Sequence, residues 1–416
     1  MYDVIIVGGR CAGAATATFL GQRGYSVLLI DRDDHPSPTL STHTFADLEL
    51  YERLGVLPEI QRSAPPLTRL RIDIEGCVLE ADMILTPWAS GLRREKLDMI
   101  LIQRAVSFPT VEWRPRTMVT DLLWENGKVM GVVAQSRTGP ATAHARLVVG
   151  ADGRRSLVAR RVKAQTYLEA PEIRCAYYAY FEDVVPLPVP AFEFYWRGTS
   201  VAQVQPCDDG LHCICIMPMQ EEFASWRKDP AGMLHTELGA FRNLAPRLVR
   251  SRRVSSVRGA GDLRSFMRHS YGPGWALVGD AAVATHPVHG AGIDGAVFGA
   301  NILAEALHKF FSGEGSWKES MADYQGRVDE RMRRAFEYAT REAGFPPLTS
   351  EKVDFLRLVC TIPTLGYMLG TGIDAVLTTV LGDGGPQRLE QLIDPRLRTA
   401  QHQQRALDPI PSIIDT

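Results

Sequence analysis

The stretch VIIVGGRCAG, residues 4–13, determines how the chain begins to fold. Its first four residues are apolar and mostly β-branched, which predicts a buried parallel strand. Alanines, Phe19 and Leu20 follow at helical spacing, so the glycines lie between a strand and a helix. A glycine loop in this position is typical of a dinucleotide site, because the turn is tight and the amino end of the helix attracts phosphate. Arg10 stands where such loops usually carry another glycine.

An acidic residue follows at the spacing that a dinucleotide site requires. Residues 25–30 predict a second buried strand, which ends at Asp31, about 20 positions after the glycines. A carboxylate there binds the hydroxyls of a ribose. For Arg10 we favour a side chain turned aside, with a phosphate contact and a solvated side chain as open alternatives. We expect Cys11 to be a small packing residue without a redox role.

Composition sets the class of protein. The chain has 416 residues, 45% hydrophobic and 23% charged, which is ordinary for a globular protein of two or three domains. A formal charge of -2 without a basic tract excludes nucleic acid as a partner. No apolar run is long enough to span a membrane, and a strand that starts at residue 2 leaves no room for a signal peptide. We therefore expect a cytoplasmic protein.

Cysteine usage gives no sign of a disulfide framework or a metal site. The seven cysteines are odd in number and scattered, and their only close pair is Cys213 and Cys215. Two sulfurs on one strand face make a poor metal site, so we expect reduced thiols and no metal.

Three further motifs occur after the first glycine loop. The middle motif, Gly150-Ala-Asp152-Gly153, follows a strand-like run and is followed by Ser156. The last motif starts at Gly279-Asp280, continues through Pro287 and ends at Gly290-Ala-Gly292, where a long helix is predicted. Between the first and middle motifs, Arg94-Glu-Lys-Leu-Asp98 opens another helix.

In this order the four motifs resemble the FAD-dependent aromatic hydroxylases, the group A flavoprotein monooxygenases. The fold of that family is shared with flavin halogenases and geranylgeranyl reductases. The resemblance implies an α/β fold: a Rossmann-like FAD-binding domain of the glutathione-reductase type, an inserted antiparallel β-sheet substrate domain and a helical C-terminal region. The expected boundaries are 1–72, 93–170 and 260–344 for FAD binding, 73–92 and 171–259 for substrate, and 345–416 for the C-terminal region.

The resemblance also assigns cofactor residues. The first motif would hold the FAD diphosphate and ribose, the middle motif would brace FAD and is associated with NAD(P)H use, and the last would hold the ribityl and flavin portions. The residues implied are Gly8, Gly9, Arg10, Cys11, Ala12, Gly13, Asp31, Arg32, Arg94, Asp152, Gly279, Asp280, Pro287, Gly290, Ala291 and Gly292.

Departures from the family pattern lie near the expected flavin ring. The family's Asn after the last glycines is Asp294 here, and we expect it to cap its helix, with another orientation or a protonated carboxyl as alternatives. His286 and His289 lie in the ring-facing segment, and His43 lies in the loop after Asp31. All three are candidate catalytic residues, with local hydrogen bonding as the alternative.

Substrate residues are expected on the inserted sheet, which covers the flavin ring in this family. The strands there alternate in polarity, and the candidate pocket residues are Tyr178, Phe194, Trp196 and Met217, with a plain core role as the alternative. These residues suggest a flat, largely apolar ligand.

The implied reaction is aromatic hydroxylation. NAD(P)H would reduce FAD, O2 would add at flavin C4a, and the hydroperoxide would transfer a hydroxyl to an aromatic or polyketide-like small molecule. A flavin halogenase is disfavoured because the chain has no Trp-x-Trp-x-Ile-Pro segment. An O2-independent reductase of the prenyl-reductase type stays open, because Phe194-Tyr-Trp196 faintly matches an aromatic motif of those enzymes. A flavin-free binding scaffold of the Rab GDP-dissociation inhibitor type is disfavoured by the intact later motifs.

Overall fold

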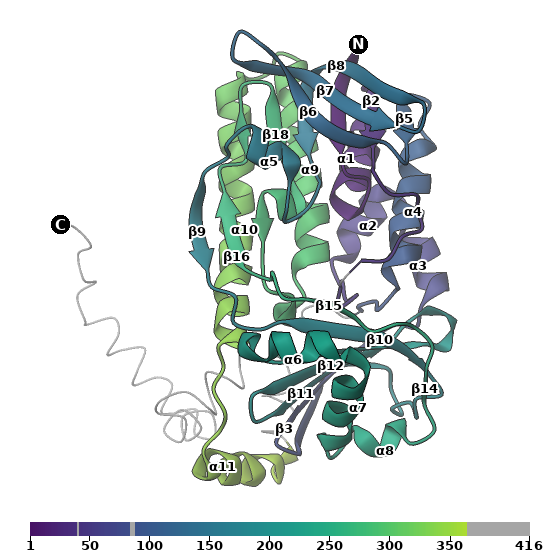
Figure 1. Cartoon of the computed structure of the whole chain (residues 1–416), viewed down its shortest axis with the longest axis vertical. Coiled ribbons are helices and arrows are strands. Elements are labelled where there is room, and N and C mark those ends of the chain that lie inside the picture. Colours follow the sequence, from purple (N-terminus) through teal and green to yellow (C-terminus); the bar gives the residue numbers. More distant parts are fainter. Residues whose placement is uncertain (40, 84–87, 364–416) are drawn as a thin grey trace, which may run out of the picture.

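A computed structural model describes residues 1–39, 41–83 and 88–363 of the chain. Two large β-sheets lie at opposite ends of the view in Figure 1, and long helices run between them.

A parallel core forms the first sheet, in the upper part of Figure 1. Its strands are β1 (Tyr2–Val7), β2 (Val27–Ile30), β5 (Val111–Arg114), β8 (Gly139–Gly150), β17 (Tyr271–Gly272) and β18 (Trp275–Leu277). Parallel pairs join β1 to β2 and β8, β2 to β5, and β8 to β18. Residues 4–7 are buried, as their β-branched run predicted.

An antiparallel hairpin of β6 (Met118–Glu125) and β7 (Lys128–Ser136) extends this sheet through β8. Its turn uses Asn126 and Gly127, with φ of 50° and 76°. Asn-Gly adopts this left-handed conformation readily, which closes the hairpin.

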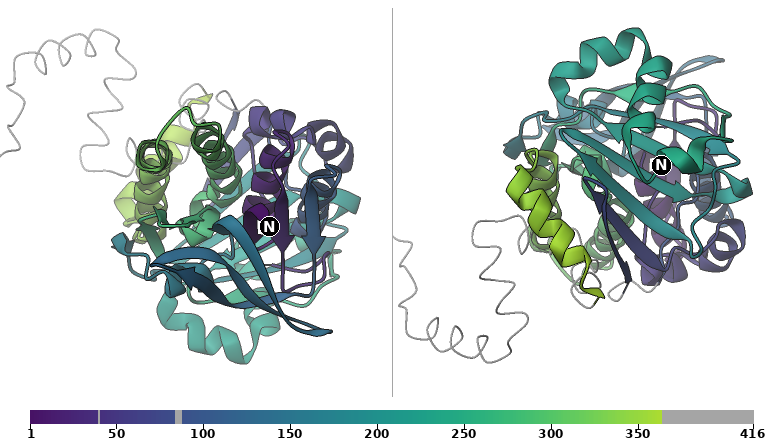
Figure 2. Two further views of the ribbon diagram at one scale, coloured as in Figure 1. Left: turned by 90° about the horizontal axis from the view of Figure 1, so that it is seen from above. Right: turned by 90° about the horizontal axis from the view of Figure 1, so that it is seen from below.

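Helices pack side by side next to the first sheet. The long ones are α1 (Cys11–Gly21), α4 (Arg94–Val106), α9 (Gly292–Phe311) and α10 (Trp317–Ala343); the short ones are α2 (Leu48–Leu54), α3 (Leu57–Ser63) and α5 (Leu157–Arg161). In the view from above, α1 lies between α4 and α9 and contacts both (Figure 2, left). Every residue of α1 is buried, so its alanines and glycines are needed for close packing.

The second sheet is mixed. Its strands are β3 (Arg69–Ile74), β4 (Cys77–Asp82), β10 (Ala176–Glu182), β11 (Ala191–Arg197), β12 (Ser200–Pro206), β13 (His212–Met217), β14 (Arg252–Arg253) and β15 (Arg258–Ala260). We predicted an antiparallel sheet, but β3 pairs with β11 in parallel, while the other pairs are antiparallel. These two strands come from separate excursions of the chain, so no hairpin fixes their relative direction. The expected domain boundary at residue 72 falls inside β3.

The two faces of the second sheet have different neighbours. One face carries Tyr177, Phe181 and Tyr195 and packs in a cluster with Trp226, Leu234 and other helical residues. The helices on that face are α6 (Phe223–Lys228), α7 (Pro230–Ala240) and α8 (Ala245–Leu248). The opposite face, called the roof below, carries Tyr178, Phe194, Trp196 and Met217 and packs in another cluster with Val288 and with Leu356 and Val359 of the helix Ser350–Cys360.

Short elements connect these layers. A small sheet contains β9 (Thr166–Ala170), β16 (Ser265–Arg268) and β19 (Val283–Ala284), and the 3-10 turns are η1 (Asp208–Gly210), η2 (Gln220–Glu222), η3 (Gly279–Ala281) and η4 (Pro287–His289). The helix α11 (Ser350–Cys360) packs against β4 (Figure 2, right). It agrees with the helical C-terminal region that we predicted; residues 364–416 lie outside the described ranges. Within those ranges no helix is long and apolar enough to cross a bilayer.

Candidate active site

Two glycines shape the turn after β1. Gly8 has a φ of +105°, and a Cβ there would lie 2.4 Å from the carbonyl oxygen of Ala151. A Cβ on Gly13 would lie 1.8 Å from the carbonyl oxygen of Gly8. Neither position has room for a side chain, so the turn itself requires both glycines. The helix α1 then begins at Cys11, and the N–H groups of its first turn point out of the helix without helical partners.

The three glycine motifs meet at one edge of the first sheet. Gly8 lies against the backbone of Ala151 and Asp152, and a Cβ on Gly279 would lie 2.6 Å from the Cβ of Ala12. The strand order β18-β8-β1-β2 brings the carboxyl ends of these parallel strands together. Ligands of α/β sheets bind at such an edge.

Asp31 is held at the end of β2 by the glycine turn. Its Oδ2 accepts a hydrogen bond of 2.6 Å from the Gly9 N–H, and its Oδ1 accepts one of 2.8 Å from the Asp33 N–H. His35 Nε2 lies 3.4 Å from Oδ2. Burial opposes the charge, but His35 and the two N–H groups lower the pKa of Asp31 below its usual value. The adjacent Arg32 is 76% exposed and lies near Asp33.

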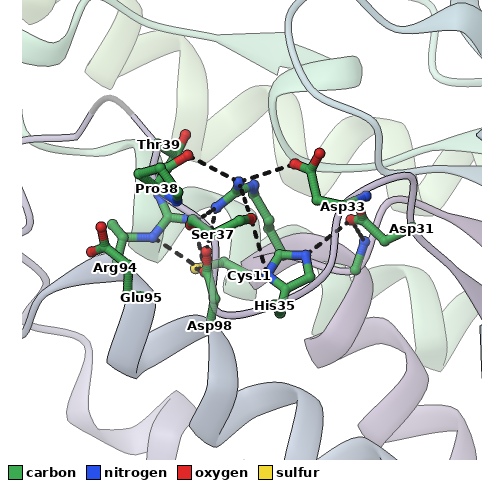
Figure 3. A network of polar contacts seen from close by, with 12 residues as sticks. Cys11, Asp31, Asp33, His35, Ser37, Pro38, Thr39, Arg94, Glu95 and Asp98 are labelled. Carbon is green, nitrogen blue, oxygen red and sulfur yellow. Dashed lines mark hydrogen bonds and ion pairs between the residues drawn. The ribbon is translucent and has the colours of Figure 1, made fainter. Parts of the chain in front are cut away.

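Two arginines share the fully buried carboxylate of Asp98 (Figure 3). Arg10 Nη1 and Arg94 Nη2 each donate to it over 2.8 Å, and Cys11 Sγ donates over 3.3 Å. Arg10 also donates to the Ser37 hydroxyl over 2.8 Å. The Arg10 side chain therefore turns toward α4 and Ser37, and a phosphate contact stays a prediction. Asp33 Oδ2 also lies 3.4 Å from Arg10 Nη2, so the two guanidiniums are balanced by two carboxylates, and an anionic ligand would be attracted by the unpaired N–H groups at the amino end of α1.

The acids of the two later motifs differ in surroundings. Asp152 accepts hydrogen bonds from the Ser156 hydroxyl (2.5 Å) and the Leu157 N–H (2.6 Å), so its carboxylate stabilises the start of α5. Asp280 has a side chain 38% exposed, and its Oδ2 lies 3.5 Å from Arg154 Nε. Asp280 is therefore the more accessible acceptor.

Open space lies in front of the amino end of α9. Gly290 has a φ of +76°, and an added Cβ on Gly290 or Gly292 would meet nothing within 4 Å. Pro287 opens the turn η4, and Ala291 precedes the first helical residue. The amino end of α9 therefore has room beside both glycines as far as the described residues go, and the N–H groups of its first turn have no helical partners.

The four candidate pocket residues share the roof. Tyr178, Phe194, Trp196 and Met217 are buried in one cluster, and their role as substrate residues stays a prediction. The rings of Phe194 and Trp196 stack at 5.7 Å with an interplanar angle of 18°. The Tyr178 hydroxyl donates to the carbonyl oxygen of Thr39 over 2.7 Å, so the roof contacts the loop after β2.

His43 lies directly under the roof. Its backbone is left-handed, with φ of 65°, and its ring is fully buried. Nδ1 lies 2.8 Å from the carbonyl oxygen of Ser41, and Nε2 lies 2.5 Å from the Tyr180 hydroxyl. A carbonyl oxygen only accepts, so Nδ1 carries the proton and Nε2 accepts from Tyr180. Glu95 Oε2 lies 3.2 Å from the same hydroxyl. Burial lowers the pKa of His43 to about 3, so the ring is neutral at pH 7.

Comparison with known proteins identifies the family. Residues 1–338 match the family described as FAD binding domain. The chain belongs to this FAD-binding family. Because the match covers most of the chain, the convergent glycine motifs are those of a flavoprotein oxidoreductase.

Relatives in this family differ in the reactions that they are named for. The chain is 25% identical to digeranylgeranylglycerophospholipid reductase 1 of Methanopyrus kandleri, over 89% of this chain and 97% of the relative. It is 27% identical to the 6-hydroxy-3-succinoylpyridine 3-monooxygenase of Pseudomonas putida, over 74% and 79%. Among solved structures, a myxobacterial chondrochloren halogenase has a TM-score of 0.76 at 22% identity and covers 92% of this chain and 97% of its own. At that identity the likeness shows the fold alone.

The residues at the carboxyl edge fit FAD. The turn at Gly8 and Gly13 exposes helix N–H groups, two guanidiniums lie beside it, and the space at Gly290 and Gly292 is open. An anionic dinucleotide requires these features. The assignment of individual cofactor residues stays a prediction from the resemblance.

Asp294 does not cap its own helix, so our preferred interpretation was wrong. Its Oδ2 accepts from the Ala46 N–H over 2.8 Å, and its Oδ1 accepts from the Tyr51 hydroxyl over 3.1 Å. The carboxyl points across to the loop before α2 because it lies inside the first turn of α9, after the capping position. Burial raises the pKa of Asp294 to about 6.

The two histidines of the last motif make local contacts. His286 Nδ1 accepts from the Val288 N–H over 3.2 Å, and Nε2 lies 3.2 Å from the Arg174 carbonyl oxygen, so both ring nitrogens are occupied. Burial lowers the pKa of His286 to about 3. His289 Nδ1 lies 3.2 Å from the buried Glu342 carboxylate. Among the described residues, His43 is the one candidate catalytic histidine whose ring makes a hydrogen bond to a strand of the second sheet, through the Tyr180 hydroxyl.

Sequence reasoning missed several polar residues of this site. It quoted Asp98 in a motif but gave it no role, and it did not single out Glu95, Gln203 or Gln205. The two glutamines had a usable signal, because period-two alternation in Ala-Gln-Val-Gln places both on the face of Phe194. Of the partners of Asp98, Arg94 lies four residues before it on the same helix and could have been predicted, whereas Arg10 lies 88 residues away in sequence and has no local signal.

Proposed function

We propose that this chain is an FAD-dependent monooxygenase that uses NAD(P)H and O2 to hydroxylate an aromatic or polyketide-like small molecule. One atom of O2 enters the substrate as a hydroxyl group, and the other leaves as water. NAD(P)H and a proton supply the two electrons and the hydrogens that this balance requires.

The observation that carries the proposal is that the roof is both aromatic and polar. Tyr178, Phe194 and Trp196 contribute buried rings to one cluster, and the Tyr180 hydroxyl lies between His43 and Glu95. A flat ring with a polar substituent suits such a surface. A geranylgeranyl chain carries no hydrogen-bonding groups along its length, so these polar groups gain nothing from it.

FAD would be held by the glycine turn, Asp31, Arg94, Asp280 and the start of α9, as the resemblance implies. When bound, it accepts electrons from NAD(P)H and passes them to O2. The chain itself supplies the surroundings. The N–H groups at the amino end of α9 favour negative charge nearby. The buried roof would keep water away from the flavin ring. Neutral His43 accepts a hydrogen bond from the Tyr180 hydroxyl at Nε2, and Glu95 Oε2 lies 3.2 Å from the same oxygen, so this hydroxyl is held between the two side chains.

The reductase reading is the second candidate, because the reductase of Methanopyrus kandleri aligns over nearly its whole length. NAD(P)H-dependent O2 uptake by the full-length FAD-loaded chain, over a panel of aromatic compounds, separates the two. Peroxide and products are quantified in the same samples. Uptake stimulated by a compound and matched by its hydroxylated product supports the proposal. Electron transfer to an organic acceptor without O2 would replace the monooxygenase proposal with a reductase. A product that forms only with halide would replace it with a halogenase.

A further inference from the structure

His289 and Glu342 form a pair of side chains that the reaction described so far does not use. Nδ1 of His289 lies 3.2 and 3.3 Å from the two carboxylate oxygens of Glu342. An ionised carboxylate only accepts hydrogen bonds, so Nδ1 donates. Glu342 is 1% exposed, and a buried carboxylate requires a partner. The carboxylate therefore holds the His289 ring in one orientation, with its proton on Nδ1.

This pair lies where the roof, α9 and α10 meet. Val288 and Ala343, the chain neighbours of His289 and Glu342, are buried in the same cluster as the roof aromatics. Gly290 follows His289 directly, with a φ of +76°, and an added Cβ there would meet no described atom within 4 Å. His289 therefore stands between the roof and the amino end of α9, which the resemblance assigns to the flavin.

One face of α10 supports the His289 ring, and one ring nitrogen stays available. Tyr338 and Glu342 are four residues apart in α10, so they lie on the same side of the helix. The Tyr338 ring lies 5.6 Å from the His289 ring, at an interplanar angle of 42°. The His289 side chain is 27% exposed, and its Nε2 makes no hydrogen bond within the described part of the chain. Nε2 is therefore left for proton exchange.

The other two candidate histidines are built differently. The rings of His43 and His286 are buried, and each has a contact at both nitrogens. Neither ring can take up or release a proton without breaking one of these contacts. Of the three candidates, His289 is thus the one whose surroundings in the described structure suit proton transfer.

We propose that His289 is a proton-transfer residue of the reaction and that Glu342 is its positioning residue. The proposed reaction consumes one proton per turnover besides NAD(P)H and O2. His289 takes this proton from solvent and donates it from Nε2 to the oxygen atom that leaves as water. The ring then returns to its neutral form with the proton on Nδ1, while Glu342 stays ionised and balances the charge that the ring carries in between. This inference rests on the proposed function, because it concerns the proton that this function requires.

Acylation by diethyl pyrocarbonate tests the place of His289 without any substrate or variant. The reagent acylates an imidazole nitrogen that is unprotonated and within its reach, and mass spectrometry of peptides identifies the histidine. Full-length chain is compared with and without bound FAD. His289 should react at least about tenfold faster than the buried His43 and His286, which react only after local opening. Equal rates for the three histidines would overturn the proposal.

His308 is the matched reference for the effect of FAD. Its Nδ1 lies 2.8 Å from the Tyr25 hydroxyl, and it belongs to the last turn of α9, at the opposite end from Gly290. Bound FAD should slow the acylation of His289 by about fivefold or more, because a bound cofactor covers the surface beside it, and should leave His308 unchanged. A His289 rate that is the same with and without FAD would place the ring outside the site and overturn the proposal.

Variants then test the proton transfer itself, with the compound to which the FAD-loaded chain passes its electrons. His289→Gln should lower kcat by about a hundredfold and leave FAD affinity nearly unchanged. Glu342→Gln keeps an acceptor for Nδ1 but removes the charge, and should lower kcat by about tenfold. The double variant should match His289→Gln alone, because Glu342 acts only through His289. Full additivity of the two losses would contradict the positioning role.

Chemical rescue separates proton transfer from a purely structural role. Free imidazole should restore part of the lost kcat in His289→Ala, since it can carry the proton in place of the missing ring. His308→Gln is the control and should keep the wild-type kcat. A His289→Ala chain that imidazole does not rescue, or an equal loss in His308→Gln, would count against the proposal.

The outcomes distinguish this inference from the proposed function. Reduction of an organic acceptor also consumes a proton, so the variants can be compared even if no hydroxylated product forms. Protection of His289 by FAD and a low kcat of His289→Gln, without a hydroxylated product, would contradict only the proposed function. Hydroxylation at the wild-type rate in His289→Gln would contradict only the role of His289.

Discussion

The carboxyl edge of the first sheet and the roof of the second sheet both border the proposed reaction site, but they differ in how complete they are. At the edge, the carboxylates of Asp31, Asp98 and Asp152 already have partners within the protein. On the roof, Oε1 of Gln203 and Oε1 of Gln205 have no hydrogen-bond partner among the described residues. The chain alone preorganises the edge, which suits a cofactor common to the family. We therefore expect differences in substrate specificity to arise on the roof and not at the edge.

Gly13→Ala should have the largest effect, because Gly13 lies where the backbone at the carboxyl edge is most closely packed. A Cβ there would lie 1.8 Å from the carbonyl oxygen of Gly8. We expect the free energy of unfolding to fall by more than about 3 kcal/mol, with loss of bound FAD. Gly239→Ala is the control, since Gly239 lies on the exposed side of α7 and nothing lies within 4 Å of an added Cβ. Denaturant unfolding and the FAD content per chain measure both, and wild-type values for Gly13→Ala would break the account of the turn.

Asp98→Ala tests whether the edge depends on its internal ion pairs. It leaves the Arg94 guanidinium, only 11% exposed, without its carboxylate. Removal of one partner of a buried pair costs about 3–5 kcal/mol of unfolding free energy. Asp33→Ala is the control. It removes a 3.4 Å ion pair between Asp33 and Arg10 at a more exposed position, so the free energy of unfolding should fall by less than about 1 kcal/mol. Similar losses in the two variants, measured by urea unfolding, would count against the special role of Asp98.

Asp294→Asn tests how a buried carboxyl at the start of α9 changes the pH dependence of stability. The folded chain raises the pKa of Asp294 to about 6, so the folded state binds this proton more tightly than the unfolded state. Its contribution to stability is present at pH 4 and is lost as the pH rises through 6, a change of about 3 kcal/mol. Asparagine removes that part of the pH dependence, while Asp82→Asn, at an exposed side chain, leaves it unchanged. Unfolding free energies between pH 4 and 7 that fall equally in wild type and Asp294→Asn would refute the buried acid.

Arg10→Gly should have the smallest effect. The Arg10 side chain turns toward Asp98 and Ser37, and Arg94 still pairs with Asp98 without it. FAD affinity, followed by flavin fluorescence, should change by less than about threefold. A loss beyond about tenfold would mean that the guanidinium contacts the diphosphate directly.

The fold was predictable because its signals are local. A β-branched run, a glycine turn and a helix identify each motif within some 20 residues, as the region from Val4 to Leu20 shows. The parallel pairing of β3 with β11 was not predictable, since no turn joins these strands. The partners of individual side chains were also not predictable from the sequence. Asp294 meets Ala46 from 248 residues away, and no local rule distinguishes that contact from a helix cap.

The type of a residue does not by itself decide between two roles that it suits. Histidines near a flavin suggest catalysis, yet both ring nitrogens of His286 are occupied by backbone groups. The period-two alternation placed Gln203 and Gln205 on one face, but only the structure shows that their amide N–H groups donate to the carbonyl oxygens of Val288 and Thr42.

Isotope transfer tests the central claim most directly. Full-length FAD-loaded chain and NAD(P)H are incubated under heavy-isotope O2 with an aromatic compound that stimulates O2 uptake, and the product is analysed by mass spectrometry. The account predicts one heavy oxygen atom in a new ring hydroxyl, with NAD(P)H consumed in equal amount. A product that carries no heavy oxygen, or a reduced product formed equally well without O2, would contradict it.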